Sequence, residues 1–275
     1  MRDLNHINEA VKSTRYIFTI SLIIPIFMGF GAWALANGAA PSLPLHDNFL
    51  EIFGLGIIAS ALLALPIPYI FKWNWESKYF GAGLLPFASG SILGIYPILC
   101  IALHSSLPAA ISLALILVEV ILIYRWCFRF IKIYRRIYLN KDLFHYIYSE
   151  ESSAVYYLQQ ADNKVINKIF KFDQFPNSKL CILSLLAAFS LTPFATPLSK
   201  FAELPFIHIF LAIASTPLNL MFLGLSTKIW LVYYFYPMKI KKETNKPVYV
   251  DISSHPSKSL ADAKPYQSFR RRIDK

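Results

Sequence analysis

The fold of this chain is decided by residues 107–136, which read LPAAISLALILVEVILIYRWCFRFIKIYRR. Residues 107–124 are apolar or small, apart from Glu119 and two hydroxyl-bearing side chains. A bilayer core needs about 20 mostly apolar residues for each helical span. This block is slightly short, but aromatic and basic residues continue it directly. The stretch therefore predicts a transmembrane helix that leaves the hydrocarbon as a basic segment lying along the membrane surface.

The composition of the whole chain indicates a membrane protein. The chain has 275 residues, of which 56% are hydrophobic and 16% charged, and its mean hydropathy is +0.46. A water-soluble domain usually carries about 25% charged residues. This shortage of charge, together with 22 Phe and 16 Tyr, excludes a disordered chain and argues against a soluble globule.

Six blocks of the sequence are long and apolar enough to cross a bilayer. Gly and Pro interrupt several blocks, which membrane helices tolerate when neighbours satisfy the freed backbone groups. We therefore expect an all-α fold: a polytopic transmembrane helical bundle with four spans before a long polar loop and two after it. The blocks cover residues 16–36, 50–71, 80–103, 107–124, 179–198 and 205–230.

The basic residues predict the orientation of these spans. Of the 27 Lys and Arg, all except Lys200 and Lys228 lie in the terminal segments or in the second and fourth loops. Because cytoplasmic loops carry an excess of Lys and Arg, both termini and these two loops are predicted to be cytoplasmic. The compact external loops suggest a bacterial inner (plasma) membrane.

The predicted organisation has four parts. Spans one to four occupy residues 1–124, and a basic, amphipathic helical loop follows over 125–178. Spans five and six occupy 179–236. The last segment, 237–275, is basic and poor in apolar residues, which predicts a disordered cytoplasmic tail.

The first block has an alternative interpretation. Ala34-Leu35-Ala36 follows a basic segment and an apolar stretch, as at a signal-peptide cleavage site. The apolar stretch is longer than the roughly 7 to 15 residues of a cleaved signal, which favours a retained anchor. Cleavage would leave five spans with the orientation of the others unchanged.

A basic face follows the fourth span. Arg125, Arg129, Lys132 and Arg136 recur at helical spacing with aromatic residues between them. Basic and aromatic residues together also occur in nucleic-acid-binding proteins. Because the face adjoins a span, contact with the anionic inner leaflet or with a partner is the better interpretation, and no nucleic acid is expected.

A second amphipathic pattern lies in the cytoplasmic loop. Apolar residues including Val155, Leu158, Val165 and Ile169 are spaced three and four apart, and Asp162 is the one polar interruption. The pattern predicts a helix over residues 155–172. Its apolar stripe either packs on the preceding helix as a hairpin or forms a docking surface for a protein partner.

Two ionisable residues inside predicted spans are candidate functional residues. A charge at the bilayer centre is costly, by about 2.5 to 3.5 kcal/mol on insertion scales, so such residues are usually paired or functional. Glu119 and Lys228 lie at similar predicted depths, and a Glu119–Lys228 pair is allowed. Either the pair is structural, or Glu119 couples transport to protons or ions.

Polar residues next to prolines form a second candidate site in spans five and six. Thr192, Thr196, Thr216 and Asn219 lie beside Pro193, Pro197 and Pro217. Each proline removes a helix hydrogen bond and frees a carbonyl. Interrupted helices of this kind expose backbone groups to substrates in many transporters, and they also occur as ordinary kinks.

Small residues four positions apart predict helix-packing faces. Gly56, Ser60 and Ala64 form one such stripe in span two, and Gly90 and Gly94 belong to another in span three. Small side chains let two helix backbones approach closely. The faces would pack within the protein or against a second copy.

The sequence predicts neither a metal site nor a cofactor. Cys100, Cys127 and Cys181 lie in or beside apolar blocks and show no Cys-x-x-Cys spacing. No metalloprotease, phosphate-loop or acidic-cluster motif is present in the sequence. We therefore expect no enzymatic activity.

Two functions are consistent with the sequence. The first is a non-catalytic, protein-binding component of an envelope assembly, such as a secretion or conjugation subunit or an immunity or exclusion factor. Its partner would be another protein or a second copy of the chain in the membrane. The alternative is a small transporter or channel that uses Glu119 and the proline-containing spans five and six.

Overall fold

The structure is a computed structural model that describes residues 14–173 and 175–252. It is mostly helical, and six of its helices are long and apolar enough to cross a membrane. This confirms the predicted bundle of six spans. The spans are Thr14–Ala39, Phe49–Ile70, Ser77–His104, Ala109–Leu139, Ser178–Ala202 and Thr216–Thr244.

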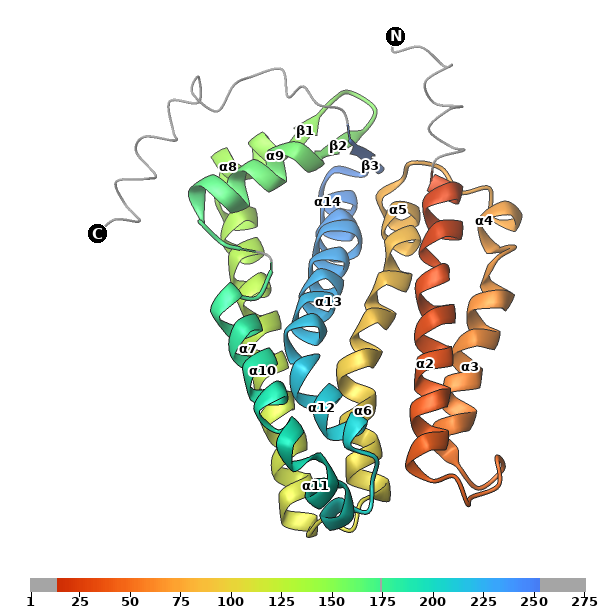
Figure 1. Ribbon diagram of the computed structural model, residues 1–275. Helices are drawn as coiled ribbons and strands as arrows, with labels where there is room; N and C mark the ends of the chain where they lie inside the picture. Colours follow the sequence, from red (N-terminus) through yellow and green to blue (C-terminus); the bar gives the residue numbers. More distant parts are fainter. Residues whose placement is uncertain (1–13, 174, 253–275) are drawn as a thin grey trace.

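The first two spans form a closely packed helical pair (Figure 1). Helix α2 (Ile23–Ala39) packs along α3 (Phe49–Ala64), and the short α4 (Ile67–Ile70) follows. A Cβ added to Gly54 would lie 2.7 Å from the backbone nitrogen of Trp33, so the two backbones are nearly in contact. Asn48 caps α3, because its side chain accepts a hydrogen bond from the Glu51 amide.

The third span is an interrupted helix at the centre of the bundle. It consists of α5 (Ser77–Leu84), the 3-10 helix η1 (Leu85–Ser91) and α6 (Ile92–His104). Pro86 lies in η1, where the regular helical hydrogen bonding changes. The span contacts both α2 and the sixth span, so it joins the two halves of the bundle.

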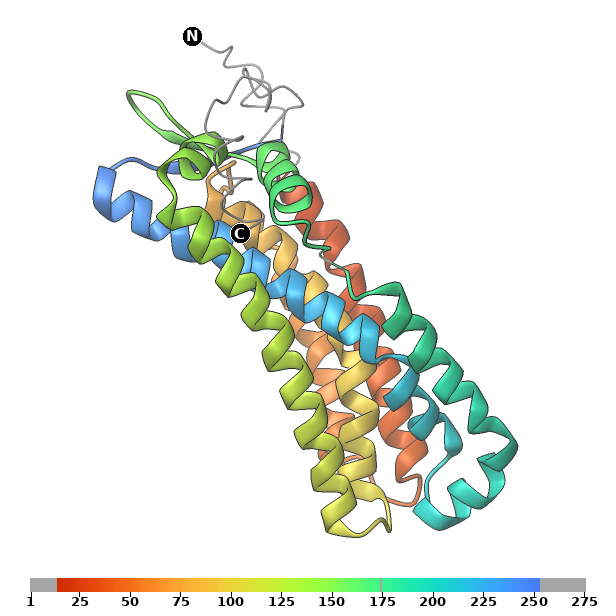
Figure 2. The ribbon, with the colours of Figure 1, turned by 90° about the vertical axis from the view of Figure 1, so that its left-hand side faces the viewer.

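The fourth span, α7 (Ala109–Leu139), is a single unbroken helix of 31 residues. At 1.5 Å per residue it is about 46 Å long, which exceeds the roughly 30 Å of a hydrocarbon core. Its C-terminal part continues straight beyond Tyr124 rather than bending into a separate surface helix (Figure 2).

The fifth and sixth spans follow the polar segment after α7 and complete the bundle. The sixth span, Thr216–Thr244, starts later than the predicted Pro205, because the separate helix α12 precedes it, and it extends beyond Trp230. The break between α12 and α13 falls at Ser215, two residues before Pro217. The elements are α10 (Ser178–Ser190), η3 (Thr192–Phe194), α11 (Ala195–Ala202), α12 (Phe206–Ala214), α13 (Thr216–Ile229), the π-helix η4 (Trp230–Phe235) and α14 (Tyr236–Thr244).

A small α/β unit, which we call the sheet module, covers one end of the bundle (Figure 1). Strand β2 pairs antiparallel with β1 and parallel with β3. Its elements are α8 (Lys141–Ile147), β1 (Tyr148–Glu150), β2 (Val155–Leu158), α9 (Gln159–Lys164), the π-helix η2 (Val165–Ile169) and β3 (Val248–Asp251).

The sheet module corrects two predictions. The helix predicted over 155–172 is wrong at its start, because residues 155–158 form a strand. The disordered tail predicted over 237–275 is wrong for residues 237–252, since α14 and β3 occupy most of that range. Val248 and Val250 of β3 are buried, and this burial stabilises the strand. The remaining residues of that tail lie outside the described ranges.

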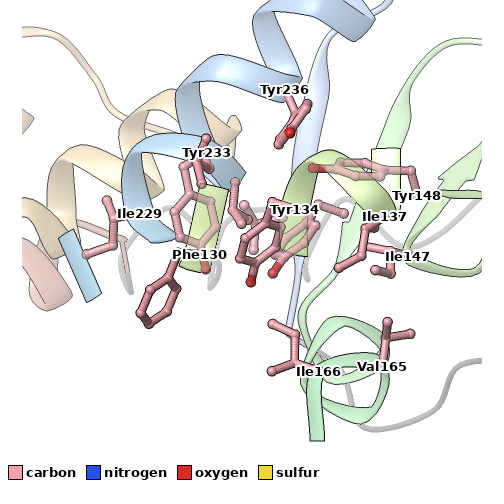
Figure 3. Packing of buried hydrophobic residues seen from close by; sticks show 14 of the residues in the cluster. Phe130, Tyr134, Ile137, Ile147, Tyr148, Val165, Ile166, Ile229, Tyr233 and Tyr236 are labelled. Atoms are coloured by element: carbon pink, nitrogen blue, oxygen red, sulfur yellow. The ribbon is translucent and has the colours of Figure 1, made fainter. Parts of the chain in front are cut away.

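The largest hydrophobic core lies between the sheet module and the bundle (Figure 3). Helix α7 contributes Phe130, Tyr134 and Ile137 from its inner face. The last span contributes residues of α13 and η4, among them Ile229 and Tyr233. The module is therefore held to the spans by a continuous apolar contact.

Candidate functional site

A buried hydrogen bond joins the fourth and sixth spans in their apolar parts. The Nδ2 group of Asn219 on α13 donates to Oε1 of Glu119 on α7. Glu119 is 7% exposed and Asn219 is fully buried. Gly94 lies against the same point, because a Cβ there would be 2.5 Å from that of Asn219. The small residue thus makes room for the polar pair.

The predicted Glu119–Lys228 pair is wrong. Lys228 lies on α13 nine residues after Asn219, about 13 Å further along the helix axis. Its Nζ atom lies 3.2 Å from Oδ2 of Asp162 in the sheet module. It also donates to Oδ1 of Asn163 at 3.2 Å. The lysine therefore connects the last span to α9 and not to the fourth span.

Asp162 is the centre of this second polar cluster. Its carboxylate is fully buried and accepts hydrogen bonds from the hydroxyls of Tyr134, at 2.9 Å, and Tyr157, at 2.8 Å. Burial raises the pKa of Tyr157 well above its ordinary value, and the Asp162 charge raises it further. Tyr157 therefore remains a neutral donor at physiological pH.

We call Asp162, Lys228, Tyr134 and Tyr157 the junction cluster. Lys228 and the polar interruption at Asp162 are both visible in the sequence, but no local pattern connects them. The available signal was a carboxylate on an otherwise apolar stripe, which requires a buried partner. The cluster joins α7, α13, β2 and α9, so it ties the sheet module to two spans.

The proline-associated threonines do not assemble into a site. Thr192 and Thr196 are exposed at the end of the fifth span. The hydroxyl of Thr192 donates to the Phe189 carbonyl, and that of Thr216 donates to the Ala212 carbonyl at 3.1 Å. These hydroxyls satisfy carbonyls of their own helical turns, so only Asn219 of the predicted set reaches a partner on another span.

The two small-residue stripes have different surroundings. Gly90 and Gly94 lie against α13, because added Cβ atoms would be 2.5 Å from Phe222 and Asn219 respectively. A Cβ added to Gly56 would meet nothing within 4 Å among the residues that the structure describes. The residue of α3 that packs closely against α2 is therefore Gly54. Gly56, which belongs to the predicted packing face, does not contact α2.

The face of α3 that carries Gly56, Ser60 and Ala64 lines an open apolar groove of about 750 Å³. Its length along the second span, from Phe49 on α3 to Ile67 on α4, is about 27 Å at the helical rise. Its walls come from three spans. The lining residues are Phe18, Leu22 and Pro25 of the first span, Ala82, Leu85 and Pro86 of the third, Trp73 before it, and Phe49, Ile52, Phe53, Gly56, Ile57, Ser60, Ala61, Ala64 and Ile67 of the second.

The apolar stripe of the sheet module does not form a free docking surface. Val165 is fully buried in the large core, and Val155 is 2% exposed. Leu158 is half-buried on β2, and Ile169 packs against the core. The docking interpretation is therefore wrong, because packing within the chain already covers most of the stripe.

The basic face of α7 is exposed along its length. Arg125, Arg129, Lys132 and Arg136 are all exposed, and none forms an ion pair within the described residues. The opposite face of the same helix segment is buried in the large core. The helix therefore supports the module on one side and presents cations on the other.

Removing the Glu119 side chain tests the intramembrane pair. Glu119→Leu is expected to lower the free energy of unfolding by about 1 to 3 kcal/mol, because the buried Asn219 amide loses its acceptor. Glu119→Gln keeps an acceptor oxygen and should cost less than about 1 kcal/mol. Reversible unfolding in mixed micelles measures both. Equal losses would show that the negative charge, rather than the hydrogen bond, is required.

Within the described residues, no group of three or more His, Cys, Asp or Glu side chains is placed to hold a metal ion. No protein-family model, curated protein or solved structure matches the chain.

Proposed function

We propose that this multi-pass membrane protein is a non-catalytic, protein-binding component of an envelope assembly, and that it receives a partner's transmembrane helix in the groove beside α3. Secretion or conjugation subunits and immunity or exclusion factors are components of this kind. The observation that carries the proposal is the groove itself. It presents Gly56 and Ser60 at exposed positions, and no atom of the described residues lies within 4 Å of a Cβ added at Gly56.

The dimensions of the groove favour a helix over a lipid chain. Its length of about 27 Å along the second span approaches the roughly 30 Å thickness of the hydrocarbon core. One acyl chain crosses only a single leaflet, about half of that distance. Small residues four apart allow a helix backbone to approach closely, whereas a flexible acyl chain does not require them.

The arrangement of the polar residues supports a non-catalytic role. Glu119 and Lys228 are the candidates for chemistry inside the spans, and each is bonded to a buried partner within the chain. Transport would need the proline-associated hydroxyls to line a shared path, and those of Thr192 and Thr216 bond to their own helices.

We also propose that the sheet module is cytoplasmic and that the membrane is a bacterial inner membrane. Among the described residues, Lys200 is the one cation at the end of the bundle opposite the module. The basic face of α7 and the lysines of α14 lie at the module end. By the positive-inside rule, this distribution supports a cytoplasmic location for the module end.

A large side chain that fills the groove should weaken binding of the partner helix. Gly56→Leu is expected to reduce partner binding by about tenfold or more, since overpacking a helix contact usually costs 1 to 3 kcal/mol. A photoreactive residue at the exposed position 60, activated in native membranes, measures binding as a crosslink to another membrane protein. The crosslinked peptide should belong to a transmembrane helix of that protein.

Matched variants make this test decisive. Gly31→Leu on α2 is the control, because an added Cβ there also meets nothing within 4 Å and Gly31 does not line the groove. It should leave the crosslink unchanged. Adducts with lipid alone, or a protein adduct insensitive to Gly56→Leu, would refute the proposal. An adduct of twice the chain mass would assign the groove to a second copy instead.

A further inference from the structure

We infer that the basic face of α7 binds the head groups of anionic phospholipids at the inner boundary of the membrane. This site is separate from the groove and does not depend on a protein partner. Its residues are Arg125, Arg129, Lys132 and Arg136, which project from successive turns of one helix.

The depth of the four cations supports this inference. From Ala109, where α7 begins, Arg125 lies about 24 Å along the axis and Arg136 about 40 Å. A hydrocarbon core is about 30 Å thick and the bilayer with its head groups about 40 to 45 Å. The cations therefore span the region where phosphate groups lie, and Arg125 reaches it by extending its aliphatic stem.

The neighbouring side chains fit a lipid rather than a soluble anion. Tyr124, Phe128 and Ile131 are exposed beside the cations and can contact glycerol and acyl groups. Arg129 lies over the ring of Trp126, with its Cζ atom 5.8 Å from the ring centroid. That contact holds the guanidinium near the helix, at the level where aromatic residues line the membrane interface.

The charge of the face is not neutralised by ion pairs among residues 14–173 and 175–252. None of the four cations forms an ion pair with a carboxylate of the described residues. Each Lys or Arg near an anionic leaflet adds favourable electrostatic energy. Four of them on one exposed face should therefore produce a measurable preference for anionic over zwitterionic lipid.

The test uses the full-length protein reconstituted in phosphatidylcholine vesicles containing a small amount of spin-labelled lipid. The measurement is the motionally restricted fraction of spin-labelled phosphatidylglycerol relative to spin-labelled phosphatidylcholine. Wild-type protein should prefer phosphatidylglycerol, and the preference should weaken as salt is added. In R125Q/R129Q/K132Q the preference should fall by about tenfold or more.

A charge-matched variant separates this site from a general effect of net charge. K164Q/K168Q/K171Q removes two lysines of the sheet module and one that follows η2, and it should keep the preference. R125K/R129K should also keep it, because phosphate recognition here needs positive charge at the right depth. Circular dichroism and gel filtration should show that all variants fold.

Three results would overturn the inference. Equal losses in both triple variants would mean that the protein's total charge determines the preference. An unchanged preference in R125Q/R129Q/K132Q would place any lipid site elsewhere. Photo-crosslinking from position 128 to protein alone in native membranes would assign the face to an acidic protein segment.

Discussion

Lys228→Met is expected to lower the free energy of unfolding by about 3 to 5 kcal/mol. This is the usual cost of removing one member of a buried ion pair, because the other member is left as an uncompensated buried charge. The remaining carboxylate of Asp162 is fully buried and cannot reach water to compensate. Tyr134 and Tyr157 still donate to it, but two neutral hydroxyls do not balance its charge. Reversible unfolding of the purified protein in mixed micelles measures the loss.

A second substitution should restore most of this stability. In the double variant Asp162→Asn/Lys228→Met no charge is left in the cluster, and the Asn oxygen can still accept from the tyrosines. We expect it to recover to within about 1 to 2 kcal/mol of the wild type. Lys168→Met, at an exposed position, should change stability by less than about 0.5 kcal/mol. Additive losses in the double variant would contradict an Asp162–Lys228 interaction.

The six spans were predictable because the demand that creates them is local. Hydrocarbon requires about 20 consecutive apolar residues whatever the rest of the chain does. The stretch around Glu119 meets that demand by itself, and its helix forms as expected. The first block likewise forms a helix from Thr14 to Ala39.

The partners of the buried polar residues were not predictable, because they depend on the axial offset between neighbouring spans. Helices α7 and α13 run side by side, with Glu119 opposite Asn219 and Trp126 opposite Gly224. Lys228 lies about two and a half turns beyond Asn219 along α13 and is therefore too far away to meet Glu119. Hydropathy fixes which residues enter the membrane but not this offset.

The sheet was missed for a related reason. Strand β3 lies in a segment whose average composition resembles a disordered tail, and it is only four residues long. Its partner β2 lies about 90 residues earlier, with Val155 paired to Val248. Such a parallel pairing depends on spans five and six bringing the two segments together. Local periodicity cannot report it.

Gly54→Leu should destabilise the protein much more than Gly56→Leu, although the two residues are neighbours on one helix. At position 54 a Cβ would lie 2.7 Å from the Trp33 nitrogen and 3.1 Å from the Gly29 carbonyl oxygen. These are backbone atoms, so α2 and α3 must separate to admit the side chain. We expect a loss of about 3 kcal/mol, at the upper end for overpacked contacts. Thermal unfolding in detergent compares the two variants.

Gly56→Leu should alter stability by less than about 0.5 kcal/mol, because its Cβ points into the open groove. The contrast separates two roles that share one sequence pattern: Gly54 holds α3 to its own chain, and Gly56 leaves α3 available to another. If Gly56→Leu were as destabilising as Gly54→Leu, position 56 would already be packed in the native protein. The groove would then not exist in the membrane, and loss of a partner in that variant would reflect misfolding.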